Sequence, residues 1–516
     1  MPTERTGTDH FETHHMTDTT DTDVLLAVDA GTTRIKTVAF GTDGTELAQT
    51  ARTIEVDRPA PGHVEQPMED TWEHAATTIR ETLAAIPEAT PLGIGLTGQG
   101  DGLWPIGADG TPARTAMLWS DSRAAPILET WEETGQLATL VETCGSSPYP
   151  GMSLPCLAWL AEERPTEFER IETILSCPSW LAFKLTGVRA IDHSEATVPY
   201  LDATTEQYAP DVFDVVGLPG AESLLPSLST PTDIVGTVTE TAAEATGLPS
   251  GLPVVSGPFD VPASAIGAGT VTPGDSVVTL GTSLTHQTIS AGPRSASAGI
   301  QMALGIDGLW TEAIGSNAGT PSLEWAVETL AGIDSIEALE AAAREAPIGS
   351  DGIVYHPYLS TSGERGPFVD PTARAQFLGL TPEHDTEHLA RAIYEGLSFA
   401  IADCVGLLPD SNGSVALGGG GARSALWCQL IADSLDRPVE VPTGSEIGAK
   451  GVAMVLGTAL GVFPSIEGAA DRMVSHDRRY QPRDTAIDRY AELVDAFVEL
   501  REELPSIWAR RDRAYQ

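Results

Sequence analysis

Basic residues, and lysine above all, are scarce in this chain. Lysine stands at only three of 516 positions, and Lys plus Arg number 29 against 73 Asp plus Glu, so the formal net charge is −44. Nucleic acids and membrane surfaces are polyanions that would repel such a chain, so we expect neither as a partner. The acids are spread along the sequence rather than gathered in a block. This pattern resembles proteins of extreme halophiles, in which salt screens self-repulsion over about 3 Å.

Long apolar runs and closely spaced cysteines are also missing. No apolar run approaches the ~20 residues that a membrane-spanning helix requires. Residues 1–23 are rich in Thr, Asp and His and lack the apolar centre of a signal peptide, so we expect a disordered tail and a soluble, cytoplasmic protein. The five cysteines show no CxxC or other metal-binding spacing, which predicts free thiols in a reducing compartment.

The length predicts two domains, and the stretch from 252 to 285 shows where their chemistry lies. A chain of 516 residues is too long for one ordinary core. An apolar strand at 254–256 is followed by a Gly-Pro turn, and Asp260 stands just before a small-residue helical segment at 263–268. A carboxylate at the end of a strand points into the cleft beyond that edge of the sheet. There it can accept a proton from a hydroxyl group.

Two Gly-Thr turns repeat one design. A strand at 277–280 breaks into GTS at 281–283, and a strand at 24–30 breaks into GTT at 31–33 before a strand resumes at 34–40. The two pieces form a weak internal repeat. Backbone N–H and hydroxyl groups of small residues can approach a phosphate closely, so two such hairpins across a cleft could hold a nucleoside triphosphate. The alternative is that each is an ordinary tight turn.

Further motifs follow in order along the chain, and together they carry a resemblance. They are GQGDG at 98–102, GMSLPCLAWLAEE at 151–163, SGERGPFVDP at 362–371 and ALGGGGARSALWCQLIAD at 416–433. With these motifs the chain resembles the FGGY family of carbohydrate kinases from about residue 24 to about residue 461. GQGDGLW and GPFDVPASAIG are most similar to its erythritol kinase and ketopentose kinase branches. The second motif departs from the family pattern at Cys156, where lysine is usual.

The resemblance implies an α/β fold of two actin-like (ribonuclease H-like) domains around a central cleft. It implies a sugar-binding domain at 24–256, a nucleotide-binding domain at 257–480 and a helical extension at 481–516. The expected ligands are ATP, Mg²⁺ and a small polyol or ketose, and a homodimer is compatible with this pattern.

The nucleotide side of the predicted cleft has three parts. Four consecutive glycines at 418–421 would let a flat adenine ring lie against bare backbone while Ser424 caps the next helix, although tight helix–strand packing would also select glycine. Asp29 is suited to hold the water shell of Mg²⁺, or else to cap its turn. The resemblance places Lys36 near the phosphoryl group, with a solvent-facing position as the alternative. Lys450 stands near the nucleotide side of the cleft, and whether it contacts a phosphate stays open. The predicted nucleotide-binding residues are Gly31, Thr32, Thr33, Lys36, Gly281, Thr282, Ser283, Gly419, Gly420, Gly421 and Ser424.

The polyol side of the predicted cleft begins at the GQGDG loop. The amide of Gln99 and the carboxylate of Asp101 could together bind vicinal hydroxyl groups, which both donate and accept hydrogen bonds. Trp104 and Trp119 could supply an apolar face for sugar C–H groups, with core packing as the alternative for either ring.

Three further polar segments have both a functional and a structural interpretation. The resemblance places the WSDSR segment with Asp121 and Arg123 near the sugar, but an ordinary charge cluster at a helix start is the alternative. Polar residues of 192–208 could reach the sugar or belong to a loop. Glu364 and Arg365 are expected to brace a loop.

These patterns predict an ATP-dependent kinase that phosphorylates a small polyol or ketose. Asp260 would contact the substrate and act as the general base, ionised at neutral pH with an ordinary pKa near ~4. The alternative is a non-catalytic nucleotide-binding regulator or scaffold on the same fold. Asp101 and Asp260 favour the kinase, because a scaffold has no use for a carboxylate beside a polyol loop. Erythritol, xylulose, ribulose and glycerol all stay open as substrates at this point.

Overall fold

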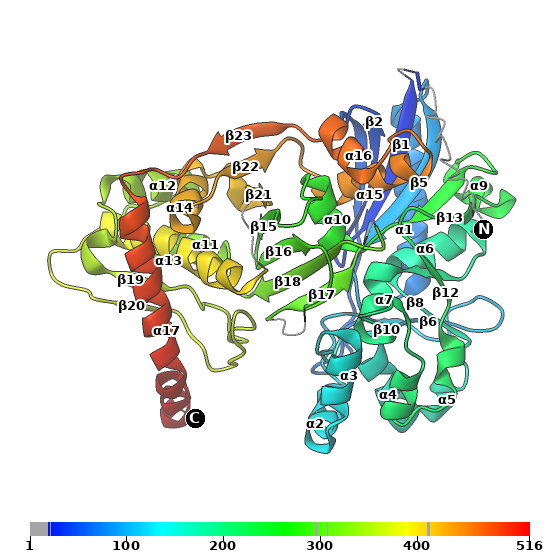
Figure 1. Ribbon diagram of the computed structural model, residues 1–516, viewed down its shortest axis with the longest axis horizontal. Helices are drawn as coiled ribbons and strands as arrows, with labels where there is room; N and C mark the ends of the chain where they lie inside the picture. The colour runs from blue at the N-terminus through cyan, green and yellow to red at the C-terminus, as the bar shows by residue number, and fades with distance from the viewer. Residues whose placement is uncertain (1–18, 21, 295–297, 307, 410–412, 516) are drawn as a thin grey trace, which may run out of the picture.

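The chain folds around two large sheets that lie side by side (Figure 1). The computed structural model describes residues 19–20, 22–294, 298–306, 308–409 and 413–515. Most of the tail predicted at 1–23 therefore lies outside the described residues. Within these ranges, no helix has both the length and the apolar character needed to cross a bilayer. All five cysteines are buried free thiols, as predicted.

The first sheet has six strands in the order β13-β14-β5-β1-β2-β3. β1 and β2 form the first predicted Gly-Thr hairpin, and they pair antiparallel with Asp29 opposite Lys36. β5 runs parallel to β1 on its other side, and β14 runs parallel to β5. The strands are β1 (Asp23–Ala30), β2 (Arg34–Gly41), β3 (Glu46–Thr53), β5 (Thr90–Gly98), β13 (Ile234–Thr237) and β14 (Pro253–Ser256).

The second sheet has seven strands in the order β17-β18-β16-β15-β21-β22-β23. β15 and β16 form the second predicted hairpin, while β21 runs parallel to β15 and β22 runs parallel to β21. An antiparallel edge strand follows in both sheets, β13 in one and β23 in the other. The strands are β15 (Ser276–Leu280), β16 (Leu284–Ser290), β17 (Ile300–Ala303), β18 (Trp310–Ser316), β21 (Val415–Gly418), β22 (Val439–Pro442) and β23 (His476–Tyr480).

The internal repeat that the two Gly-Thr turns predict thus extends to the strand arrangement of the two sheets. In each, three antiparallel strands are extended on the side of the first strand by two parallel strands and one antiparallel edge strand, and the second sheet adds β17 as a fourth antiparallel strand beyond β18. This architecture agrees with the predicted pair of similar α/β domains.

Two small-residue helices lie between the sheets, α10 (Asp260–Gly267) and α15 (Ile447–Ala459). A Cβ added at Gly267 would lie 1.8 Å from the carbonyl oxygen of Ile447, and one at Gly451 would lie 1.9 Å from that of Ala263. Only glycine permits backbones this close, which explains the small residues of both helices. α15 also packs on β1 and β5, although it follows the second sheet's strands in sequence.

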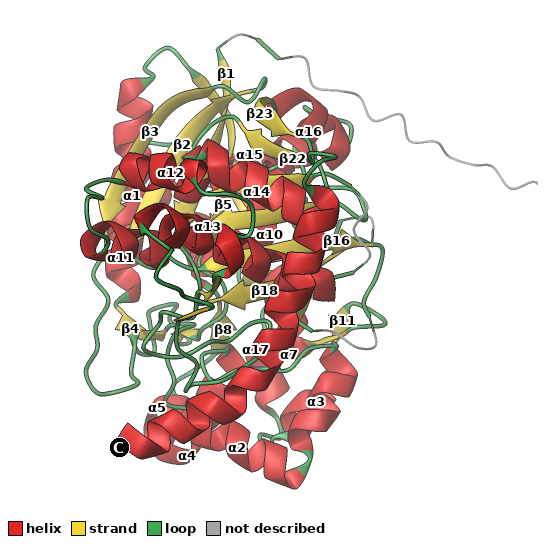
Figure 2. Ribbon diagram, turned by 90° about the vertical axis from the view of Figure 1, so that its left-hand side faces the viewer, coloured by secondary structure: helices red, strands yellow, loops and turns green. Residues whose placement is uncertain are grey.

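The outer face of the second sheet is covered by helices that follow β18 in sequence. Their apolar residues form one core with β15 and β21. α17 extends from this half down to the C-terminal end of the chain (Figures 1 and 2) and corresponds to the helical extension predicted at 481–516. The helices are α11 (Pro321–Thr329), α12 (Ile336–Glu345), α13 (Thr386–Leu407), α14 (Ala425–Leu435) and α17 (Ile487–Tyr515), with α16 (Ile466–Met473) between the sheets.

The first half carries a second layer of helices and small sheets beyond its main sheet. α1 (Met68–Ala85) packs on β2 and β3. β6 (Trp104–Ile106) pairs with β8 (Thr173–Leu175) outside the main sheet. The remaining elements of this layer are α2 (Ala125–Thr134), α3 (Gln136–Cys144), α4 (Ser153–Glu163), α6 (Cys177–Thr186), β9 (Ala190–Asp192), α7 (His193–Tyr200) and α8 (Asp211–Val215).

Candidate functional site

Three parallel strands of the first sheet end at one edge, and each is followed by a predicted site residue. In the register of the sheet, Asp29 lies beside Thr97 and Ser256 lies beside Leu96. The turn at 31–33, the loop that begins at Gln99 and the helix that begins at Asp260 therefore leave the sheet at the same edge. Ligands of open α/β sheets bind at the carboxyl ends of parallel strands, so this edge is the candidate site.

Asp260 is the first residue of α10 and is half-buried. Burial raises its pKa to about 8, with further increases from the charges of Asp29 and Asp101, although the backbone N–H of Val261 lowers it. The predicted ordinary pKa near ~4 is therefore wrong for the ligand-free protein. Carboxyl groups of β1, of the loop after β5 and of the start of α10 lie close to one another here, and with this pKa Asp260 keeps its proton at neutral pH.

Asp101 stands in a left-handed conformation, with φ of 58°. The hydroxyl of Tyr149 donates to its Oδ2 at 2.6 Å, and its own N–H donates to Oε2 of Glu195 at 3.2 Å. Burial raises the pKa of Asp101 to about 6, against the lowering effect of the Tyr149 hydrogen bond. Asp101 is therefore held by two residues that come from distant parts of the chain.

Gln99 ties the GQGDG loop to its surroundings and is almost fully buried, with 2% of its surface exposed. Its side-chain oxygen accepts a hydrogen bond from the Thr32 hydroxyl at 3.2 Å, and its amide nitrogen donates to Gln66 at 2.8 Å. Gln99 thus joins the first Gly-Thr turn to the polyol loop. A direct contact between Gln99 and a substrate stays a prediction.

The two tryptophans have different environments. Trp104 has no exposed surface and packs in the core with Trp180, so its predicted role as a substrate-facing ring is wrong. All three residues of β6 are buried, so Trp104 packs in the interior together with Leu175 of β8. Trp119 donates its indole N–H to the Thr32 hydroxyl at 2.9 Å, and the Arg365 guanidinium lies 6.0 Å from its ring centre. Trp119 therefore lies beside the site.

Three charged residues outside the sheet edge act as braces. Glu364 is buried and its Oε1 accepts hydrogen bonds from the backbone N–H groups of Asn317 and Arg365 at 2.7 and 2.9 Å, as expected of a loop brace. Asp121 and Arg123 form a buried ion pair at 2.7 Å, and Asp121 also accepts from the N–H of Val64. This pair is an internal cluster, which agrees with the structural alternative.

Asp29 is half-buried beside Lys36 and Glu446. Burial raises the pKa of Asp29, the charge of Lys36 lowers it, and the charge of Glu446 raises it. The described part of the chain has no group of three His, Cys, Asp or Glu side chains that could chelate a metal. A single buried carboxylate beside the phosphate turn nevertheless fits a hydrated Mg²⁺, which keeps several waters and prefers oxygen.

The two Gly-Thr turns are partly open to solvent. Gly31 and Thr32 are half-buried with Thr33 exposed, and Gly281 and Ser283 are half-buried with Thr282 exposed. The N–H of Thr320 donates to the carbonyl oxygen of Gly281 at 2.9 Å and braces the second turn. Each turn thus presents small residues beyond the end of its sheet.

The glycine run at 418–421 serves packing at most of its positions. A Cβ at Gly418 would lie 2.6 Å from Ile447, one at Gly419 would lie 2.6 Å from the Leu280 carbonyl, and one at Gly421 would lie 2.5 Å from Trp427. Gly419 and Gly420 are exposed, so backbone there stays available to a flat ring.

Ser424 caps α14 by accepting a hydrogen bond from the N–H of Trp427 at 3.1 Å, as predicted. The side chain of Lys450 is buried and donates to the Thr443 carbonyl at 2.9 Å. This contact directs Lys450 to backbone, and whether Lys450 contacts a phosphate stays open.

Sequence reasoning missed two residues that contact Asp101. Glu195 lies in the segment 192–208, for which the sequence allows either contact with the sugar or a loop. The first part of this segment folds as α7. Tyr149 lies in an irregular segment without a recognisable motif. The only signal for Glu195 was the cluster of polar residues in DHSEATVPYLD.

Comparison with family models gives two matches that share one family description. Residues 24–267 match the N-terminal domain of the FGGY family of carbohydrate kinases, and residues 276–460 match its C-terminal domain.

Curated relatives match over nearly the full length. The erythritol kinase of Brucella abortus (strain 2308) is 30% identical over 509 residues, which cover 94% of this chain and 97% of that protein. The xylulose kinase of Bacillus subtilis (strain 168) is 27% identical over 490 residues, with 92% and 95% covered.

Solved structures show the same fold. The ligand-bound xylulose kinase from Lactobacillus acidophilus superposes with a TM-score of 0.88 at 21% identity, covering 95% of this chain and 99% of that one. The xylulose kinase from Rhodospirillum rubrum gives a TM-score of 0.85 at 25% identity, with 94% and 100% covered.

Proposed function

The chain belongs to the FGGY family of carbohydrate kinases, and from this premise we propose that it transfers the γ-phosphoryl group of ATP to a hydroxyl group of a small polyol or ketose, with Asp260 as the general base. The observation that carries the role of Asp260 is its place at the sheet edge. Its carboxylate follows β14 directly, close enough to Asp29 and Asp101 for their charges to raise its pKa. A base between a phosphate turn and a polyol loop is where proton transfer is needed.

The reaction requires one proton transfer to this chain. Asp260 accepts the proton of the substrate hydroxyl group. The oxygen of that hydroxyl forms a bond to the γ-phosphorus, and the bond from this phosphorus to the β–γ bridging oxygen breaks to release ADP. Because the ligand-free pKa of Asp260 is about 8, the carboxyl group must first lose a proton before it can act as a base. General-base catalysis contributes typically about 10²–10⁴-fold.

The phosphate turns would position the triphosphate. Backbone N–H groups and hydroxyls at 31–33 and 281–283 are suited to phosphate oxygens, and the exposed backbone of Gly419 and Gly420 is suited to the adenine. Mg²⁺, when bound to the triphosphate, would neutralise charge on the β- and γ-phosphates, and Asp29 would hold its water shell.

The site favours an uncharged substrate. Asp101, Asp260 and Glu195 lie close enough for their carboxyl groups to influence one another's pKa, and Lys36, which lies beside Asp29, is already paired with Glu446. A sugar acid would add a further carboxylate to this group, which Coulomb repulsion disfavours. Asp101 and Tyr149 can accept from and donate to hydroxyl groups, as a tetritol or ketopentose requires.

A coupled ADP-release assay tests the function. We propose to run it in multimolar KCl against tetritols, pentitols, ketopentoses, glycerol and gluconate. ADP release should depend on a neutral polyol or ketose and should be absent with gluconate. ADP release that does not depend on any of these acceptors would contradict the proposal and favour the non-catalytic nucleotide-binding scaffold.

A further inference from the structure

We propose that Glu195 is a positioning residue of the polyol site, which acts through Asp101 by holding that residue's backbone. The inference rests on the proposed function only for its kinetic effect. The structural part, that Glu195 fixes the loop around Asp101, can be measured without substrate.

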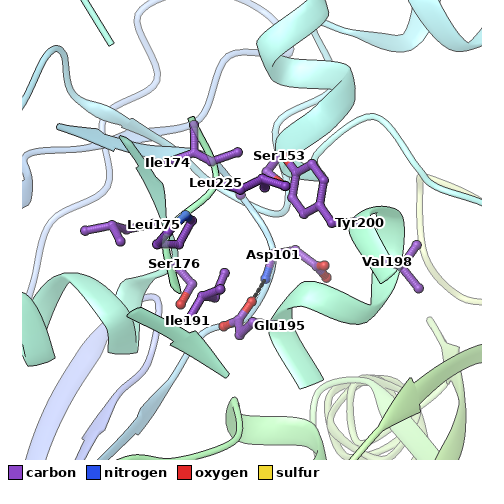
Figure 3. Close-up of a pocket in the computed structure, with 12 residues that line it drawn as sticks. Asp101, Ser153, Ile174, Leu175, Ser176, Ile191, Glu195, Val198, Tyr200 and Leu225 are labelled. Carbon is purple, nitrogen blue, oxygen red and sulfur yellow. Dashed lines mark hydrogen bonds between the residues drawn. The ribbon is translucent and has the colours of Figure 1, made fainter. Parts of the chain in front are cut away.

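The contact joins two segments that are distant in sequence. Glu195 lies in the first turn of α7 and is 7% exposed, and its Oε2 accepts the N–H of Asp101 at 3.2 Å (Figure 3). Asp101 has a φ of 58°, a left-handed conformation that a residue with a Cβ adopts only when its surroundings hold it. Glu195 supplies the side-chain acceptor for the backbone of this residue.

The conformation matters because it directs the Asp101 side chain. With its backbone so held, Asp101 points its carboxylate to the Tyr149 hydroxyl at 2.6 Å and lies close enough to Asp260 to raise that residue's pKa. If Asp101 relaxed to an ordinary right-handed or extended conformation, its carboxylate would leave this position. Glu195 therefore determines where Asp101 presents its oxygens to a substrate.

The same turn of α7 also contacts the residue before α10, the helix that begins at Asp260. Asp192 accepts hydrogen bonds from the backbone N–H and the hydroxyl of Ser194, at 2.9 and 2.8 Å. The Ser194 hydroxyl in turn accepts the N–H of Phe259, the residue before Asp260, at 3.3 Å. One short turn thus fixes the loop of Asp101 and the entry to Asp260 relative to each other.

Glu195 occupies a setting that suits a neutral acceptor. Its Oε1 has no hydrogen-bond partner among the described residues, and the group lines a cavity of about 10 Å³, room for about one water. Burial raises the pKa of Glu195 well above its usual range, and the charges of Asp192, Asp101 and Asp260 raise it further. A carboxamide can accept the Asp101 N–H in the same way as a neutral carboxyl group.

The substrate-free test is amide hydrogen exchange of residues 98–102 in the full chain. Glu195→Ala should speed exchange in this loop, while Glu195→Gln should leave it at the wild-type rate, because the amide oxygen replaces Oε2. Glu172→Ala removes the side chain of an exposed glutamate next to β8 and serves as the control for the loss of a glutamate that does not contact the loop. Unchanged protection of the loop in Glu195→Ala would overturn the inference, whatever the enzyme turns over.

Kinetics then test the action through Asp101. Glu195→Ala should raise the KM for the polyol at least about tenfold and leave the KM for ATP unchanged. In an Asp101→Asn background, Glu195→Ala should not raise the polyol KM further. Glu195→Gln should stay within about twofold of wild type. Glu195→Asp withdraws the carboxylate by one methylene and should behave like Glu195→Ala, so it replaces that variant if Ala does not fold.

Three kinetic results would contradict the inference. They are an unchanged polyol KM in Glu195→Ala, an equal loss in the Asp101→Asn background, and a loss in Glu195→Gln as large as in Glu195→Ala. Absence of polyol-dependent ADP release in the wild type would instead contradict the proposed function, and hydrogen exchange would still decide the role of Glu195.

Discussion

Lys36 and Glu446 form an ion pair with 2.5 Å between Nζ and Oε2, across 410 residues of sequence. The pair joins β2 of the first sheet to the residue that precedes α15, and it lies beside Asp29. One of only three lysines in the chain is thus placed where it partly neutralises a carboxylate of the site.

Replacing this lysine should affect both stability and nucleotide binding. Lys36→Met leaves Glu446 without its partner and removes the charge that lowers the pKa of Asp29, so the free energy of unfolding should fall by about 1–3 kcal/mol. The KM for ATP should rise. Arg489→Met, which removes an exposed arginine paired with the exposed Glu492 at 2.9 Å, should cost less than about 1 kcal/mol and leave the KM for ATP unchanged. Equal effects of the two variants would contradict this assignment.

Removing the proposed base should abolish transfer without abolishing nucleotide binding. Asp260→Asn keeps the size of the side chain but cannot accept the proton, so kcat should fall by about 10²–10⁴-fold or more. ATP affinity, measured by calorimetry, should stay nearly unchanged. The exposed Asp214→Asn is the control. Sugar-dependent turnover that persists in Asp260→Asn would rule out this residue as the base.

Activity should rise with pH through the pKa of Asp260. Only the ionised carboxylate accepts a proton, so kcat/KM should increase by up to about tenfold per pH unit below a pKa of about 8 and level off above it. A profile that is flat between pH 6 and pH 9 would show that Asp260 does not control the rate.

The same group makes stability depend on pH in the opposite direction. The folded pKa of about 8 lies above the ordinary value near ~4, so stability is fully present below ~4 and is lost as pH rises through 8. Asp260→Asn removes this loss. The melting temperature of the variant relative to wild type should therefore be higher at pH 9 than at pH 5, and a difference that does not change with pH would contradict the raised pKa.

Low salt should inactivate the protein. The formal net charge is −44, so acidic side chains repel one another. The distance over which this repulsion acts is about 3 Å at 1 M salt and lengthens to about 10 Å at 0.1 M. Activity and melting temperature should fall on dilution from multimolar KCl, and choline chloride at equal ionic strength should restore much of both. Full activity in dilute buffer would count against a halophilic host.

The contact between α10 and α15 should tolerate no added methyl group. Gly267→Ala would place its Cβ 1.8 Å from the Ile447 carbonyl, so the free energy of unfolding should fall by at least about 1–3 kcal/mol. Gly406 is the matched control, a glycine in α13 whose added Cβ meets nothing within 4 Å. Gly406→Ala should be neutral or stabilising by up to about 1 kcal/mol. Chemical denaturation of both variants measures the difference.

The parts of the fold that follow from local pattern were predictable. Both Gly-Thr turns are hairpins because strand, turn and returning strand are adjacent in sequence. Asp260 could be placed at a strand end for the same reason.

The residues and properties that depend on distant contacts were not predictable. Glu195 meets Asp101 only because α7 folds back on the GQGDG loop, and no spacing in the sequence encodes that contact. The sequence does not say which face of β6 carries Trp104, so it could not decide between a substrate-facing ring and the core-packing alternative, which its burial favours. The raised pKa of Asp260 arises mainly from burial, with added effects of Asp29 on β1 and Asp101 in the loop after β5, so a single motif could not reveal it.

The glycine contact between α10 and α15 fixes Asp260, the proposed base, to the half of the molecule that contains the first sheet. α15 rests on β1 and β5, and α10 is fixed to α15 with backbone against backbone. Asp260 therefore stays with the strands that precede the proposed acceptor loop, and the match to the N-terminal family domain at 24–267 includes its whole helix, whereas the domain boundary predicted at 256/257 assigns this helix to the other half. We propose that closure around the substrates keeps the proposed base and the alcohol in register while the donor nucleotide is brought to them.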